Sequence, residues 1–234
     1  MQPTQFTLPV TLPEDETLDS FFSPSLHPAV DYIRQYLAQP AGKAPLYLFG
    51  ASGCGKSHLL YAACVQAQEM GLTSQLLALE HWQQLDARVL DDLEHLDLVC
   101  LDNVQAIATD LSWQTAVFDL YNRMAEQGNC LIIVANQAPA QLGLQLADLV
   151  SRLQACTSFQ LRLLSDADKQ LLLQHKAHLR GMELSSDVAR YLLNRQQRDI
   201  RALLAILDAL DQASIVHQRK ITIPFVKAVL ADDE

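Results

Sequence analysis

This sequence lacks the features that are typical of membrane proteins, secreted proteins and small domains held together by a structural metal. No apolar run approaches the roughly 20 residues that a membrane-spanning helix needs, and no low-complexity tract is present. The amino-terminus is polar without a basic start, so we expect no secretion signal. The five cysteines are never paired at metal-ligand spacing, and four lie in or beside apolar segments, as reduced core thiols do. A cytoplasmic protein fits these absences best.

Basic residues are also few. The formal net charge is −10, which argues against independent DNA binding, because affinity for a phosphate backbone comes from clustered Lys and Arg. Half of the 234 residues are hydrophobic, so we expect a sizeable core in one large domain or in a medium and a small one.

The most informative stretch joins an apolar strand at residues 46–49 to a glycine-rich turn and then to an apolar helix at 59–70. The turn has the pattern Gly-x-x-x-x-Gly-Lys-Ser, which in this context predicts a phosphate-binding loop. Glycines let backbone N–H groups surround an anion, and the helix adds the positive end of its dipole. The alternative is a chance glycine turn. The predicted nucleotide-binding residues are Gly50, Ala51, Ser52, Gly53, Cys54, Gly55, Lys56, Ser57 and His58.

Two later apolar strands end in polar residues. The strand at 98–101 ends in Asp102, where a carboxylate beside a phosphate loop can hold Mg²⁺ together with the Ser57 hydroxyl. Standing alone, this aspartate would be interpreted as the start of a turn. The next residue is Asn103, and an amide cannot accept a proton, so we expect intrinsic hydrolysis to be weak or absent. The strand at 131–135 ends in Asn136, which we expect to face the γ-phosphate position.

The periodicity divides the chain into a tail at 1–13, an α/β domain at 14–164 and a helical domain at 165–234. The α/β part alternates strands and helices, which predicts a five-stranded parallel sheet with helices on both faces. Its remaining strands are expected at 76–79 and 159–163, and its helices at 26–38, 81–90, 111–126 and 144–153. A capping box at 165–168 opens the helical part, with helices expected at 166–180, 186–195, 199–218 and 223–230.

The tail contains Gln5-Phe-Thr-Leu-Pro-Val10. An extended segment with aromatic and aliphatic anchors is a plausible ligand for a pocket on another protein. The alternative is a tail that folds back onto its own domain.

These motifs, followed by Arg152 on a late helix and by Asp199-Ile-Arg201 in the helical part, together resemble an AAA+ ATPase with a helical lid. The helix at 113–124 (with Gln114, Phe118 and Asn122) and the stretch at 104–107 resemble the ATPase core of the replication initiator DnaA. The resemblance covers about residues 14–230. A short acidic core of this kind with a Gln-x-x-Leu-Pro tail is similar to the Hda family of DnaA-inactivating proteins.

The resemblance implies roles for individual residues. Lys56 and Ser57 match the Walker A ligands of ADP or ATP with Mg²⁺, Asp102 the Walker B carboxylate, and Asn136 the sensor 1 residue. Arg201 matches sensor 2, a lid arginine that touches the nucleotide phosphates. Arg152 matches the arginine finger that acts on a nucleotide held by a neighbouring subunit; without the resemblance it would be an ordinary surface arginine.

The tail residues Gln5, Leu8 and Pro9 match the motif that docks on the DNA-polymerase sliding clamp, with Val10 in place of the more usual leucine. The implied function is regulation of replication initiation: the clamp-bound protein presents Arg152 to ATP held by DnaA and accelerates its hydrolysis, which prevents re-initiation. Its contact with DNA would be indirect. The alternatives are a DnaC-like helicase loader and a self-sufficient oligomeric ATPase. Nucleotide preference and oligomeric state, including a homo-oligomer, stay open.

Overall fold

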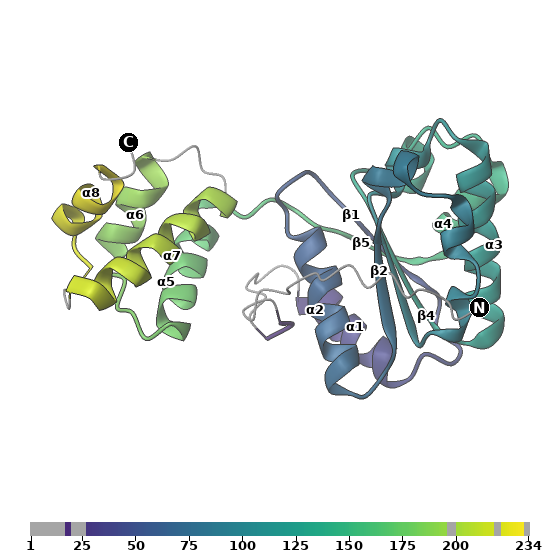
Figure 1. The fold of residues 1–234 in the computed structure, drawn as a ribbon, viewed down its shortest axis with the longest axis horizontal. Coiled ribbons are helices and arrows are strands. Elements are labelled where there is room, and N and C mark those ends of the chain that lie inside the picture. Colours follow the sequence, from purple (N-terminus) through teal and green to yellow (C-terminus); the bar gives the residue numbers. More distant parts are fainter. Residues whose placement is uncertain (1–16, 20–26, 196–199, 218–220, 232–234) are drawn as a thin grey trace.

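The computed structural model describes residues 17–19, 27–195, 200–217 and 221–231 (Figure 1). It contains a parallel β-sheet with helices on both faces, followed by a group of helices at the carboxyl end. Among the described residues, none of the helices has the length and apolar character needed to cross a bilayer. The predicted tail at 1–13, with the predicted clamp ligands Gln5, Leu8, Pro9 and Val10, lies outside the described residues.

The sheet has five parallel strands in the order β2-β3-β4-β1-β5. Their side chains are almost all apolar in the three middle strands, as expected where helices cover both faces. The order places the carboxyl ends of β3, β4 and β1 next to one another, and the loop after β1 therefore lies beside the residues that follow the other two. The strands are β1 (Leu46–Phe49), β2 (Ser74–Ala78), β3 (Leu98–Asp102), β4 (Cys130–Ala135) and β5 (Thr157–Gln160).

Two hydrophobic cores hold the layers together. Helices α1 (His27–Ala38) and α2 (Lys56–Glu69) pack on one face of the sheet. Helices α3 (Leu111–Gln127) and α4 (Ala147–Ala155) pack on the other. Each fully buried leucine in these cores stabilises the fold by about 1.5–3 kcal/mol. Short 3₁₀ turns complete the second layer: η1 (Leu79–Gln84), η2 (Ala87–Leu90), η3 (Leu93–His95), η4 (Val104–Ile107) and η5 (Pro139–Gln141).

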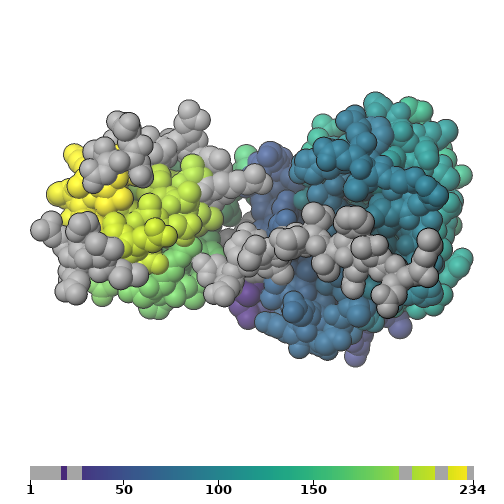
Figure 2. Space-filling view, viewed as in Figure 1, coloured from purple at the N-terminus to yellow at the C-terminus, as the bar shows by residue number. Residues whose placement is uncertain are grey.

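The carboxyl-terminal helices have a hydrophobic core of their own. They are α5 (Asp166–Leu179), α6 (Ser186–Arg195), α7 (Ile200–His217) and α8 (Ile223–Ala231). The predicted capping box opens α5: the Ser165 side chain accepts from the Asp168 N–H, and the Asp168 carboxylate accepts from the Ser165 N–H. Figure 2 shows this group, in green and yellow, as a separate mass beside the blue and teal sheet domain.

Most predicted elements are confirmed within a few residues, but three were placed wrongly. The single helix expected at 81–90 is instead the pair of 3₁₀ turns η1 and η2. The last strand ends at Gln160 instead of continuing to residue 163, because its register pairs Thr157–Gln160 with β1. Helix α4 begins at Ala147 instead of residue 144, because the N–H groups of Gln145 and Leu146 donate to the Gln114 side chain.

Candidate functional site

The loop after β1 has the backbone geometry that its glycines permit. Gly53 and Gly55 have φ values of 80° and 94°, in the left-handed region that favours glycine. Gly50 needs glycine for a different reason, because a Cβ there would lie 2.2 Å from the Leu161 carbonyl oxygen. Helix α2 begins directly after Gly55, so the free N–H groups of its first turn point toward the loop. The predicted turn therefore has the backbone geometry of an anion-binding loop at a helix amino-terminus.

Lys56 carries its charge inside this loop. Its side chain is buried, and Nζ donates to the carbonyl oxygens of Gly50 and Ala51, both at 2.8 Å. A phosphate group entering the loop would give the ammonium an ionised partner, which makes a shorter and stronger hydrogen bond than a neutral carbonyl. The remaining loop residues, Ser52 and Cys54, are respectively exposed and buried.

Ser57 and Asp102 meet although 45 residues separate them in the chain. The Ser57 hydroxyl donates to Asp102 Oδ2 at 2.8 Å. The other carboxylate oxygen, Oδ1, is buried and has no hydrogen-bond partner among the described residues. Burial raises the pKa of the Asp102 carboxyl, although hydrogen bonds from the Ser57 hydroxyl and the Asn103 backbone N–H and the Lys56 charge act in the opposite direction. The Asp102 carboxylate and the Ser57 hydroxyl together offer only oxygen ligands, which is the kind of ligand that Mg²⁺ prefers.

A chain of polar side chains crosses the carboxyl edge of the sheet. Asn103 Nδ2 lies 3.4 Å from Glu80 Oε2, just after β2. Gln105 Nε2 donates to Asn103 Oδ1 at 3.0 Å, and Gln105 Oε1 accepts from the Asn136 backbone N–H at 3.1 Å. The sequence predicted the position of Asn136 at the end of β4, where its side chain is exposed. It did not predict Glu80 as a neighbour of Asn103, since no motif connects residues 23 positions apart.

Arg152 lies on the opposite side of the sheet from α2. It is an exposed residue of α4, and its guanidinium carbon lies 5.9 Å from the Phe118 ring centroid and 5.8 Å from that of Tyr121. Both rings belong to α3, which packs on the second face of the sheet with α4. Cation–π contacts of this kind restrict an arginine that would otherwise sample many rotamers.

Two further predicted residues lie in α2 and α7. His58 follows Ser57 in α2, and burial together with the positive charge of Lys176 lowers its pKa to about 4. Arg201 lies in the first turn of α7, and its side chain is outside the described part.

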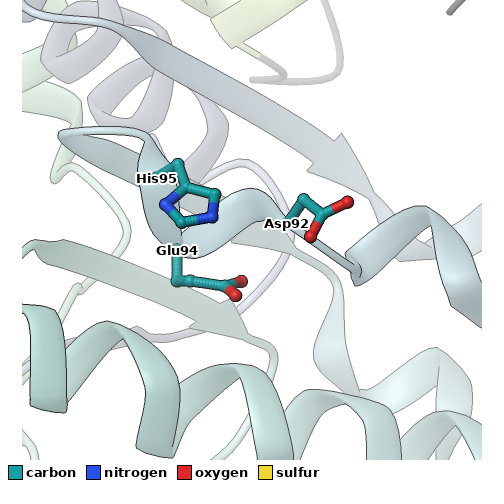
Figure 3. Close-up of side chains that lie close together, drawn as sticks. All are labelled: Asp92, Glu94 and His95. Atoms are coloured by element: carbon teal, nitrogen blue, oxygen red, sulfur yellow. The ribbon is translucent and has the colours of Figure 1, made fainter.

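One cluster of possible metal ligands lies away from the loop, between η2 and β3. The nearest ligand atoms of Asp92, Glu94 and His95 lie within 4.8 Å of one another (Figure 3). The Glu94 carboxylate already accepts from Arg123 Nε at 2.9 Å, so an ion pair accounts for one of the three side chains. Clusters of exposed acids are common on protein surfaces, and we assign this one no function.

The parallel sheet, the glycine loop that precedes α2 and the separate helical group define an α/β protein with the AAA+ fold. A model of the bacterial DnaA ATPase domain matches residues 12–160, and the chain belongs to that family. A model of the lid domain of Hda matches residues 166–230. The helical group is thus similar to the lid of Hda, and the match begins at the first residue of α5.

Solved structures share the whole fold at low sequence identity. Domain III of the replication initiation protein DnaA from Thermotoga maritima is 21% identical with a TM-score of 0.75, covering 94% of this chain and 98% of that one. AMPPCP-bound DnaA from Aquifex aeolicus is 22% identical with a TM-score of 0.72, covering 86% and 66%. The Holliday junction branch migration motor RuvB of Thermotoga maritima is 13% identical with a TM-score of 0.69, covering 92% and 71%.

Proposed function

We propose that this protein is a nucleotide-binding regulator of replication initiation that stimulates ATP hydrolysis by DnaA. In this proposal ADP or ATP occupies the loop at 50–57 and orders the lid. The tail tethers the protein to the sliding clamp, and Arg152 acts on the nucleotide of DnaA.

Nucleotide binding is supported by the loop itself. It combines glycine-permitted backbone, a helix amino-terminus and the buried Lys56 ammonium. The relatives with this fold include a DnaA bound to AMPPCP. Ser57 and Asp102 would hold Mg²⁺, which would supply positive charge to the phosphates.

The observation that carries the regulatory part is the location of Arg152. This exposed arginine belongs to α4 and packs against two aromatic rings of α3, on the face of the sheet opposite α2. An arginine in that place is suited to a nucleotide held by another molecule. Trans arginine fingers stabilise the charge that develops during phosphoryl transfer and contribute roughly three to five orders of magnitude in rate.

The residue after Asp102 also fits a protein that supplies an arginine while its partner carries out the hydrolysis. Asn103 has no carboxylate with which to activate water, and its side chain is engaged by Gln105. A regulator that acts on its partner's nucleotide does not need its own catalytic base, because DnaA supplies the chemistry.

The clamp part rests on the sequence Gln5-x-x-Leu8-Pro9-Val10. Tethering to a clamp on DNA would raise the local concentration of Arg152 near DNA-bound DnaA without any new contact between the two proteins. A net charge of −10 fits a protein that reaches DNA through a partner.

The first experiment measures binding of purified sliding clamp to the intact chain and to a Gln5→Ala, Leu8→Ala double variant. Binding that disappears in the variant would support the tail as the clamp ligand. If the intact chain does not bind, the clamp part of the proposal is wrong, and a helicase-loader function becomes the next to test.

The second experiment measures ATP hydrolysis by DnaA with clamp, DNA and either the intact chain or Arg152→Ala. The variant should bind nucleotide and clamp normally and lose the stimulation. Arg190→Ala, which alters an exposed lid arginine paired with Asp187, is the matched control and should stimulate normally. Normal stimulation by Arg152→Ala would refute the arginine-finger assignment.

A further inference from the structure

We propose that Gln105 is a positioning residue that sets how strongly the site discriminates nucleoside triphosphates from diphosphates. It would act through Asn136, whose backbone it holds. The inference rests on the proposed function, since it requires a nucleotide in the loop at 50–57.

The carboxamide of Gln105 joins the ends of two neighbouring strands. Its Nε2 donates to Asn103 Oδ1 at 3.0 Å, just after β3. Its Oε1 accepts from the Asn136 N–H at 3.1 Å, just after β4. Gln105 is partly buried and belongs to η4. One side chain therefore fixes the separation of the two polar residues that end these strands.

An amide at residue 103 is complementary to both of its neighbours. Asn103 presents its oxygen to Gln105 and its Nδ2 to the Glu80 carboxylate, at 3.0 and 3.4 Å. Its backbone has a φ of 59°, a left-handed conformation that Asn adopts more readily than most residues. A carboxylate at this position would face Glu80 with like charge. Asn103 thus has a structural reason to be an amide, besides the absence of a catalytic base.

The other side of Asn136 is fixed by the phosphate loop. Strand β4 pairs with β1 so that Ala135 lies beside Phe49, and the Gly50 N–H donates to the Ala135 carbonyl at 3.3 Å. Asn136 is therefore held between the start of the loop and Gln105. Its side chain is exposed and takes no part in these two hydrogen bonds, so it can contact a ligand.

A diphosphate and a triphosphate differ by the terminal phosphoryl group. A residue that touches only that group contributes to the affinity for the triphosphate alone. If Gln105 orients Asn136 toward that group, removing Gln105 changes triphosphate affinity and leaves diphosphate affinity unchanged. A general structural role would weaken both equally.

The test measures the dissociation constants of ADP and of a nonhydrolysable ATP analogue, with Mg²⁺, for the full chain by calorimetry. Gln105→Met keeps the side-chain length and removes both hydrogen bonds. We expect the dissociation constant of the ATP analogue to rise by about three- to tenfold, which moves the ratio of the two constants toward one. The ADP constant and the melting temperature should stay nearly unchanged. Gln141→Met, at an exposed position of η5, is the matched control and should keep the wild-type ratio.

A double-mutant cycle separates positioning from an independent effect. Asn136→Ala alone should shift the ratio at least as much, and adding Gln105→Met to it should shift the ratio no further. With nucleotide binding intact, three results would overturn the proposal. They are additive shifts in the double variant, an unchanged ratio in Gln105→Met, and equal dissociation constants for ADP and the ATP analogue in the wild type. Failure of the wild type to bind either nucleotide would overturn the proposed function as well.

Discussion

The Ser57 hydroxyl donates a 2.8 Å hydrogen bond to Asp102 Oδ2, which connects the first turn of α2 to the last residue of β3. The two elements come from different parts of the chain and meet only because β1 and β3 flank β4 in the sheet. The bond leaves Asp102 Oδ1 buried without a partner among the described residues. This carboxylate costs the fold free energy, since burial raises its pKa.

Asp102→Asn should therefore stabilise the free protein while weakening magnesium-dependent nucleotide binding. A carboxyl whose pKa is raised by folding penalises the folded state when it is ionised, so the penalty is present at neutral pH and disappears below the ordinary pKa of Asp. An amide keeps an acceptor for Ser57 and removes the charge. We expect an equal or higher melting temperature at pH 7 and an affinity for ATP with Mg²⁺ lower by about tenfold or more.

The check is a thermal melt without ligand, followed by ATP titrations with Mg²⁺ and with excess chelator. The variant and the wild type should differ with Mg²⁺ and agree with chelator. Asp91→Asn, at an exposed position before η3, should match the wild type in every measurement. An equal loss of affinity under both conditions would show that Asp102 acts on the loop and not on a metal.

His58 should make the stability of the protein depend on pH. Burial, with the Lys176 charge in the same direction, lowers the pKa of His58 to about 4. Because the unfolded chain takes up the proton first, this contribution to stability is present above about pH 6.5 and is lost as the pH falls toward 4. The loss should reach about 3 kcal/mol.

Denaturant unfolding of the wild type and of His58→Gln between pH 4 and 7.5 tests this. The variant should lose less stability over that range than the wild type. His81→Gln alters an exposed histidine and should retain the wild-type slope. Parallel curves for the wild type and His58→Gln would contradict the prediction.

Local sequence signals were sufficient for the elements that carry the candidate site. The strand, glycine turn and helix around Lys56 and the capping box at Ser165 each depend on residues close together in the chain. The helix expected at 81–90 was wrong because Asp86 accepts from the Arg88 N–H and begins a separate turn. Helical spacing of apolar residues cannot reveal this local competition.

Contacts between distant residues that belong to no common motif could not be predicted from the sequence. The edge strand β5 alternates half-buried and exposed residues, so its end does not show in the apolar pattern, and the pairing with β1 decides it. The hydrogen bond between Gln105 and Asn136 likewise depends on two strands being neighbours, which the order of the sheet determines.

Phe118→Leu should reduce stimulation of DnaA without affecting nucleotide or clamp binding. The Phe118 ring is one of two that lie against the Arg152 guanidinium. Losing an exposed cation–π contact costs about 0.5–1 kcal/mol, so we expect stimulation to fall by about two- to fivefold. The measurement is the DnaA hydrolysis assay with the variant. Gln154→Ala, at an exposed position two residues after Arg152 in α4, should stimulate normally. A loss of stimulation equal to that of Arg152→Ala would point to direct contact between Phe118 and DnaA.

Gln114→Leu should be among the most destabilising single changes in the α/β part. Gln114 is fully buried, and its Nε2 donates to the carbonyls of Ile107 and Ala108, both at 3.0 Å. Its Oε1 accepts from the N–H groups of Gln145 and Leu146 at 2.7 and 2.9 Å. Leucine fills similar space and satisfies none of the four groups. A fully buried polar group left without a partner costs about 1–3 kcal/mol. Only the bond to the Ile107 carbonyl is fully buried, and water can partly replace the other three, so we expect a total loss of about 3–5 kcal/mol.

Denaturant unfolding of Gln114→Leu beside Gln127→Leu measures that loss, since Gln127 is exposed at the end of the same helix. The control should change the free energy of unfolding by less than about 0.5 kcal/mol. Because residues 145 and 146 lead directly into α4, which carries Arg152, the folded fraction of Gln114→Leu should also stimulate DnaA less than the wild type. A variant that unfolds like the control would show that the backbone groups find other partners and that the Gln114 carboxamide is dispensable for the position of α4.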